Sequence, residues 1–162
     1  MDLSFLSEPV TKEVAEEAAY GAGAAPDGTY TMRITSFRGR LSSQKQTPMF
    51  QINFAHTGEI ARKKGATLTL FNNDIGRRQL AELAVACGIS PEDASGLQFG
   101  WGQEMDEYGR YLGYVVDVTG SPVSELFFGK DVVAVLKSDT LEDGKSYQKV
   151  KYIKVMKQKK SE

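Results

Sequence analysis

Apolar and polar side chains alternate with a period of two in several short segments of this sequence, which is the pattern of strands buried on one face. In the first segment, Tyr30, Met32 and Ile34 alternate with threonine and arginine residues. This alternation predicts a protein built mainly from half-buried β-strands. The segments expected to form the main strands are 29–35, 49–55, 66–71, 132–136 and 147–156.

One helix is expected between the third and the fourth of these strands. Asn73 or Asp74 is a suitable N-cap, and Gly88 stands where a glycine commonly ends a helix. Ser90 and Pro91 favour a second, short helical turn. The apolar stripe expected to pack the main helix is Ile75, Leu80, Leu83, Ala84 and Cys87, interrupted by the polar Gln79.

Three strands, a helix and two closing strands follow the order of the OB fold, a small five-stranded Greek-key barrel. We therefore predict a mainly β protein with one or two helices. Its expected core is an OB-fold-like five-stranded antiparallel barrel with the helix between strands three and four. The alternative is an unrelated β-sandwich with one helix.

The 162 residues have the length of one domain with extensions. Residues 1–25 are expected to be an acidic N-terminal arm and linker, with a short helix within 9–20. Residues 26–156 are expected to form the barrel domain, with an excursion at 96–122 that turns back as a hairpin near Glu107. Residues 157–162 are a basic tail, and no apolar run approaches the roughly 20 residues that span a membrane.

The composition argues against several kinds of chemistry. A single cysteine, Cys87, excludes an internal disulfide, and Cys87 with the single histidine, His56, cannot supply the usual four ligands of a structural zinc site. His56 has no evident nucleophilic partner, and the chain lacks a glycine-rich phosphate loop. The sequence therefore predicts a protein that is not an enzyme and uses no metal or cofactor.

The net charge of −1 hides a segregation of charge along the chain. Residues 28–70 hold seven basic residues and one acid, and residues 131–162 hold eight lysines and five acids. Residues 1–27 and 71–130 are both net acidic. The two basic segments fall on predicted strands and their loops, so pairing of the strands would gather positive charge on one surface, as phosphate binding requires.

Outward aromatic side chains beside basic ones favour binding of single-stranded nucleic acid, because bases stack on aromatic rings and phosphates attract cations. The opposite interpretation is that the aromatics fold back under loops and the lysines protect an exposed sheet edge. The candidate stacking residues are Phe37, Phe71, Trp101 and Tyr147, and the candidate phosphate-binding residues are Arg33, Arg38, Arg40, Lys45, Lys137, Lys145, Lys149 and Lys151.

The last predicted strand makes this hypothesis specific. Alternation places Tyr147, Lys149 and Lys151 on its outer face and Val150 and Tyr152 on its inner face. If the strand closes a barrel, the outer three residues are expected to line the same groove as Arg33 and Phe71.

Four pieces of the sequence, in this order and spacing, resemble the bacteriophage single-stranded-DNA-binding proteins of OB fold. The resemblance covers roughly residues 28–93 and 124–156. The pieces are Gly28-Thr29-Tyr30, the segment from Pro48 to Phe54, the segment from Phe71 through Ile75 to Leu80 and on to Gly88, and the pair of segments 129–132 and 145–151.

The resemblance implies coating of single-stranded DNA, with little sequence preference, during phage DNA replication or recombination in the cytoplasm of the host bacterium. It also implies phage replication or recombination proteins as partners, for which the acidic arm from Met1 to Tyr20 is the candidate contact. Residues 96–122 depart from the family pattern as an insertion, and the tail is basic. The alternatives are a virion assembly protein that uses the barrel for protein contacts, and an RNA-binding protein.

Overall fold

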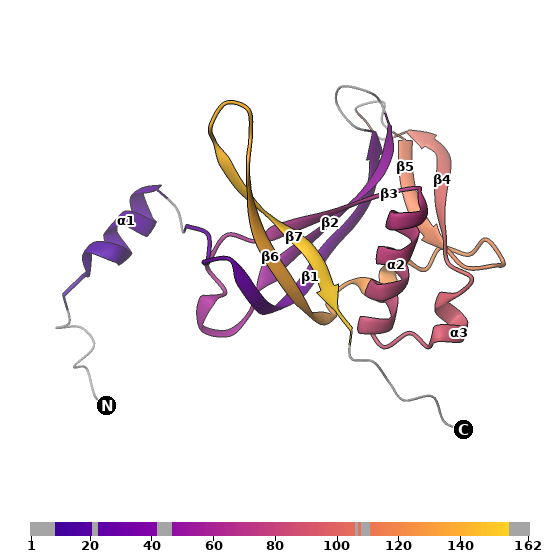
Figure 1. Ribbon diagram of the computed structural model, residues 1–162, viewed down its shortest axis with the longest axis horizontal. Helices are drawn as coiled ribbons and strands as arrows, with labels where there is room; N and C mark the ends of the chain where they lie inside the picture. The colour runs from indigo at the N-terminus through magenta and orange to yellow at the C-terminus, as the bar shows by residue number, and fades with distance from the viewer. Residues whose placement is uncertain (1–8, 21–22, 42–46, 106, 108–110, 156–162) are drawn as a thin grey trace.

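The computed structural model of the chain describes residues 9–20, 23–41, 47–105, 107 and 111–155 (Figure 1). Two sheets and a long helix form its body, and a shorter helix lies to one side. The helices are α1 (Lys12–Tyr20), α2 (Asp74–Ala86) and α3 (Pro91–Ala94), and the strands are β1 (Gly28–Leu41), β2 (Pro48–His56), β3 (Ala66–Phe71), β4 (Gln98–Met105), β5 (Tyr111–Val116), β6 (Asp131–Thr140) and β7 (Ser146–Lys154).

Five strands close into a barrel in the order β1, β2, β3, β7, β6 and back to β1. This confirms the predicted OB-like barrel, with α2 between its third and fourth strands. Neighbouring strands are antiparallel except β3 and β7, which are parallel. The predicted all-antiparallel pairing is therefore wrong at one place, because strand directions cannot alternate all the way around a ring with an odd number of strands.

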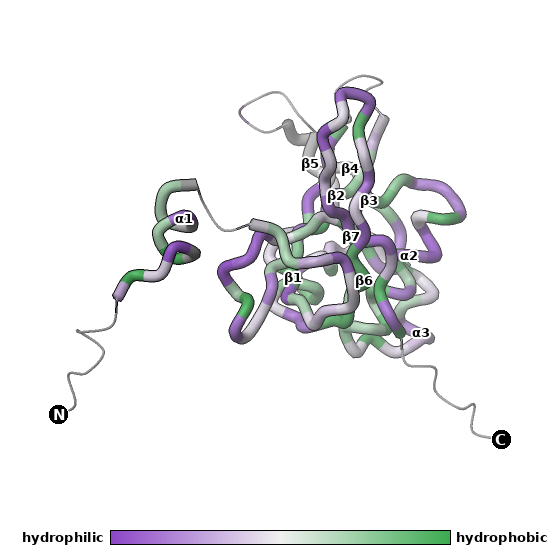
Figure 2. The backbone as a smooth tube through the Cα atoms, turned by 60° about the vertical axis from the view of Figure 1, so that its left-hand side comes forward, coloured by the Kyte–Doolittle hydropathy of each residue, from purple (hydrophilic) through white to green (hydrophobic). Residues whose placement is uncertain are grey.

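The core fills the barrel with the inward residues of its strands, and hydrophobic and hydrophilic residues alternate along them (Figure 2). Met32, Ile52 and Leu70 are fully buried from three successive strands. Helix α2 adds Leu80 and Leu83 to the same core. The alternation in the sequence thus correctly located most of the core.

Two β-bulges overturn the alternation at positions that matter for the site. The register of β1 against β2 shifts between Ile34 and Ser36, so Thr35 is an extra residue and Phe37 turns inward. The expectation that Phe37 faces outward is therefore wrong, because the side chain is only 5% exposed and packs against Phe50 and Phe127.

The second bulge lies in β7. Val135 pairs with Tyr152 and Leu136 with Val150, so Lys151 is the extra residue. Val150 is buried as expected, but Tyr152 is 41% exposed and lies outside the barrel. The inward position predicted for Tyr152 is wrong for the same reason as the outward position of Phe37.

Helix α2 begins as the sequence predicts, since the Asn73 side chain accepts a hydrogen bond from the Gly76 amide at 2.8 Å. The stripe is wrong at Ile75, which is 72% exposed. Gly76, not Ile75, takes the buried position in the first turn, where its Cα faces the Phe71 backbone. Ile75 precedes Gly76 in the helix, so its side chain points away from the barrel and towards solvent.

Strands β4 and β5 form an antiparallel hairpin within residues 96–122, and Phe99 and Trp101 of β4 pack against the barrel core. The rings of Phe99 and Trp101 lie 4.9 and 5.1 Å from the ring of Phe50. A Cβ at Gly39 would lie 2.4 Å from the Gly113 Cα, so β1 and β5 approach more closely than side chains would allow. Glycine at both positions lets the hairpin reach the barrel.

Residues 23–27 form a strap that fastens the arm to the barrel. The Lys64 amide donates to the Gly23 carbonyl at 3.1 Å, and the Gln148 side chain donates to the Ala25 carbonyl at 2.7 Å. Ala25 is buried, so contact with the barrel begins before the boundary expected at Pro26. Helix α1 itself stands apart from the barrel (Figure 1).

Candidate nucleic-acid interface

The outer faces of β1, β2 and β3 form one surface, because the strand register places their outward residues in rows. Directly opposed side chains on one face lie close enough to interact. The three rows are Arg40, Met49 and Phe71; Arg38, Gln51 and Thr69; and Ser36, Asn53 and Thr67. None of these nine residues is acidic and two are arginines, so the surface carries positive charge, although Met49 within it is buried.

Hydrogen bonds join the residues within one row and connect the other two rows. Asn53 donates to the Ser36 hydroxyl at 2.7 Å and accepts from the Thr67 hydroxyl at 2.8 Å. Arg40 donates to the Gln51 side chain at 2.9 Å. The surface therefore presents fixed polar groups and does not depend on mobile side chains alone.

A groove of about 660 Å³ opens between β3 and β7. The two strands share one register pair, Thr67 with Lys149, and the groove lies where they diverge. Its lining includes Thr67, Thr69 and Phe71 from β3, and Tyr147, Lys149 and Lys151 from β7. The structure thus brings the aromatic and the two lysines of the last strand to the same groove as Phe71, as the sequence predicted.

Phe71 stands between this groove and a second hollow of about 510 Å³, which Asn72, Asn73 and Trp101 also line. The Phe71 side chain is 40% exposed, in agreement with its predicted outward position. The Phe71 backbone lies directly against Gly76, where a Cβ would come within 1.7 Å of the Phe71 carbonyl oxygen. Replacing that glycine would push the end of β3 away from α2.

The aromatic side chains differ in how much of each ring is available. Tyr147 is 44% exposed at the β7 side of the groove. Trp101 is partly buried against Phe50 and reaches the second hollow with the rest of its surface. Trp101 therefore packs against the core, as one interpretation of the sequence held, and its role in base stacking stays a prediction.

The cationic side chains are not equally available either. Lys149 forms an ion pair with Asp139, and this partner raises the pKa of the ammonium. No carboxylate among the described residues pairs with Lys151 or Arg38. The groove therefore carries positive charge that is partly neutralised at one lysine.

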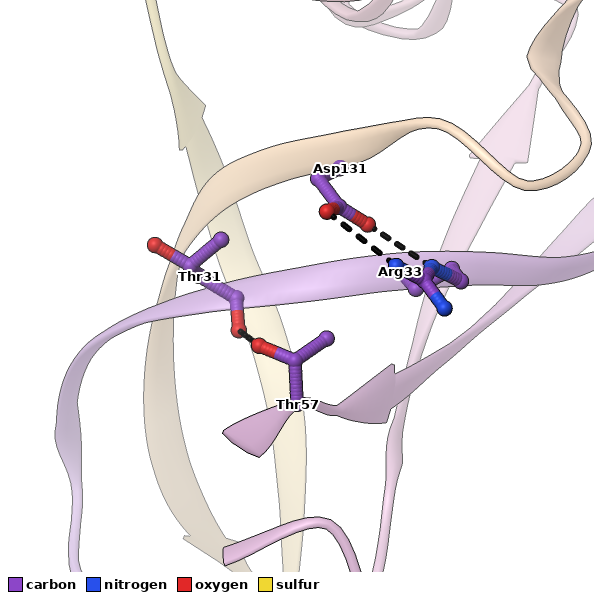
Figure 3. Close-up of polar contacts among 4 residues, drawn as sticks. All are labelled: Thr31, Arg33, Thr57 and Asp131. Atoms are coloured by element: carbon purple, nitrogen blue, oxygen red, sulfur yellow. Dashed lines mark hydrogen bonds and ion pairs between the residues drawn. The ribbon is translucent and has the colours of Figure 1, made fainter. Parts of the chain in front are cut away.

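Arg33 does not line the groove, which corrects the expectation that it would. Its guanidinium forms two hydrogen bonds to Asp131 across the β1–β6 pair, at 2.9 and 3.4 Å (Figure 3). These hydrogen bonds and the charge of the carboxylate raise the Arg33 pKa. In the same part of β1 the Thr57 hydroxyl donates to the Thr31 carbonyl.

The remaining candidates lie around the groove or outside the description. Lys137 is exposed on β6, opposite Lys149 in the register and near Asp27, whereas Lys145 lies in the turn before β7. Neither lines the groove. Lys45 lies outside the described residues.

Sequence reasoning missed the amide side chains of the site. Gln51 from β2 and Gln79 from α2 line the groove. Gln148 from β7 lines it too, but its side-chain nitrogen already donates to the Ala25 carbonyl and to Asp27. The outward parity of Gln51 and the polar interruption at Gln79 in the helix stripe were the available signals. Amides can donate to and accept from base edges and phosphates without adding charge.

His56 belongs to the core and not to the interface. It is 3% exposed, its ring packs edge-on against Tyr30 at 4.9 Å, and neither ring nitrogen has a hydrogen-bond partner. Desolvation by burial lowers its pKa, so the neutral imidazole is favoured. Over the described part of the chain, no group of three or more histidine, cysteine or acidic residues could hold a metal ion.

No helix in the described ranges is long and apolar enough to cross a membrane.

A scan of the sequence against protein-family models finds no match, and a search of curated proteins finds none either.

Proposed function

We propose that this protein binds single-stranded DNA in the groove between β3 and β7, without catalysis and with little sequence preference. The observation that carries the proposal is that Phe71, Tyr147, Lys149 and Lys151 line one groove. Phe71 and Tyr147 are 76 positions apart in the sequence. Exposed aromatic rings beside cations are what a single strand needs, because unpaired bases stack on the rings while its phosphates meet the cations.

The same features favour a single strand over a duplex. In a duplex the base faces are already stacked on each other, so Phe71 and Tyr147 have no face to meet. Every base has a face that can stack, which makes this contact tolerant of sequence. The resemblance to phage proteins supports a role in phage DNA replication or recombination within the host bacterium.

The test is fluorescence anisotropy with labelled dT, rU and duplex oligonucleotides of equal length at two salt concentrations. We count four cations at the interface, Arg38, Arg40, Lys149 and Lys151, and one of them is neutralised by Asp139. Three net contacts predict a loss of about twentyfold in affinity between about 50 and 200 mM salt, at a slope of roughly −0.7 per phosphate.

Binding of dT well above duplex, with this salt dependence, supports the proposal. Equal binding to duplex and single strand contradicts it. Binding of rU alone assigns the groove to RNA.

A further inference from the structure

Helix α1 carries an apolar stripe that its own barrel does not cover. Val14, which is 52% exposed, and Ala18 lie one turn apart on one face of α1, and Val10, 74% exposed, comes just before the helix. Both views show the helix standing apart from the barrel (Figures 1 and 2). A helix of nine residues is too short to be stable by itself in water, so its order depends on a partner surface.

A groove of matching character lies between α2 and the end of β7. It has a volume of about 510 Å³, and Val85, Tyr152, Ile153 and Val155 form its apolar part. Tyr152 is exposed there because of the bulge at Lys151, which turns its ring outside the barrel.

The charges at the two surfaces are complementary. Arg78 and Lys154 flank the groove, and the Arg78 side chain is 84% exposed although Glu82 lies 3.3 Å away. Helix α1 contains three glutamates and one lysine, and residues 1–27 have six acids. An amphipathic helix that lays its apolar face into an apolar groove, with acids meeting bases at the rim, is a common recognition mode.

The arm is poorly placed to reach the groove of its own chain. The strap holds Gly23 against Lys64, and the three peptide steps from Tyr20 to Gly23 span at most about 11 Å. Helix α1 and helix α2 lie on opposite sides of the barrel (Figure 1). The arm therefore points towards a neighbouring molecule.

We propose that α1 of one copy of this chain docks in the α2–β7 groove of a second copy. The contact joins two different surfaces of the molecule, so successive copies can extend into a row. A single short helix buries little surface, which makes the contact weak in free solution. Copies on one DNA strand would meet at a high effective concentration, a consequence that rests on the proposed function.

The test uses two matched variants of the full chain, Tyr152→Glu and Tyr147→Glu. Both tyrosines lie on β7 and are similarly exposed, at 41% and 44%, but only Tyr152 lines the α2–β7 groove. Sedimentation velocity at low salt, from micromolar to near-millimolar protein, measures self-association, and anisotropy with labelled dT measures DNA binding.

We expect the sedimentation coefficient of the unaltered chain and of Tyr147→Glu to rise with concentration, and Tyr152→Glu to lose this rise. DNA binding should show the reverse pattern and fail in Tyr147→Glu, so the two proposals can fail separately. An unaltered chain that stays monomeric over the whole range, or a Tyr152→Glu variant that associates normally, overturns the arm contact.

A charge exchange provides the second test. Arg78→Glu should weaken association, because it places an acid opposite the acidic helix α1. Adding Glu16→Lys should restore association, because the exposed position 16 then carries a positive charge that can pair with the new acid at position 78. Restoration cannot come from a general effect on folding. Association that is unchanged in Arg78→Glu contradicts the proposal.

Discussion

If the proposed function holds, removing one carboxylate should strengthen DNA binding. Asp139 pairs with Lys149 at the edge of the β3–β7 groove, so the lysine cannot give its full charge to a phosphate. In Asp139→Asn the pair is lost and one cation is released to the groove. Both side chains are more than 40% exposed, so the pair contributes little to stability and the variant should fold normally.

The expected gain follows from counterion release. One more neutralised phosphate adds about 0.7 to the slope of log affinity against log salt for a single strand. If the contribution vanishes near 1 M salt, the affinity of Asp139→Asn exceeds that of the unaltered chain by about eightfold at about 50 mM and about threefold at about 200 mM. The gain should therefore shrink as salt rises.

The assay is a salt titration of labelled dT binding by anisotropy, with Asp131→Asn as the matched control. Asp131 makes the same kind of ion pair, but with Arg33 and away from the groove. The control removes one negative charge from the whole molecule without adding a cation to the site. Equal gains in both variants would show that only overall charge matters, and a loss of affinity in Asp139→Asn would refute the placement of Lys149 at the phosphates.

Three further changes test the site and the core. Phe71→Ala should weaken dT binding by about 5- to 150-fold, the effect of losing roughly 1–3 kcal/mol of stacking, whereas Phe128→Ala, which removes a similarly exposed ring outside the groove, should leave affinity unchanged in the same titration. Gly76→Ala should destabilise the fold by about 1–3 kcal/mol in urea unfolding, because the new Cβ meets the Phe71 carbonyl, while Gly23→Ala, with open space around it, should not. Because burial lowers the folded-state pKa of His56 from its ordinary value of 6.5, the unfolded chain binds more protons, so urea stability should be full above about pH 6.5 and fall as the pH drops below it. His56→Leu should flatten that acid slope, and an unchanged slope would assign it to other groups.

The sequence located the strands because alternation reports one local property, the burial of one face. The alternation did not locate the bulges at Thr35 and Lys151, since each shifts the phase by one residue, and an aromatic after such a shift reads in the sequence like an aromatic on the other face. Each bulge reversed the side of one aromatic residue. Phe37 was lost from the site to the core, and Tyr152 was gained by the outer surface.

The ion pairs were likewise beyond the sequence. Arg33 and Lys149 looked equivalent, as basic residues on outward positions of strands. Their acids, Asp131 and Asp139, are 98 and 10 positions away, and only strand pairing decided which base each acid reaches. That pairing holds Arg33 away from the groove and partly neutralises the charge of Lys149 within it.

The sequence alone indicated the order of the barrel strands and the helix, and an N-cap of α2 at Asn73 or Asp74. These features depend on local chemistry, such as alternation, capping and charge, that neighbouring residues supply. The tertiary structure decided the parallel closure of β3 with β7, and with it the groove that Phe71, Tyr147 and Lys151 line. Ring closure and strand register join residues far apart in the chain, and no local pattern encodes those distances.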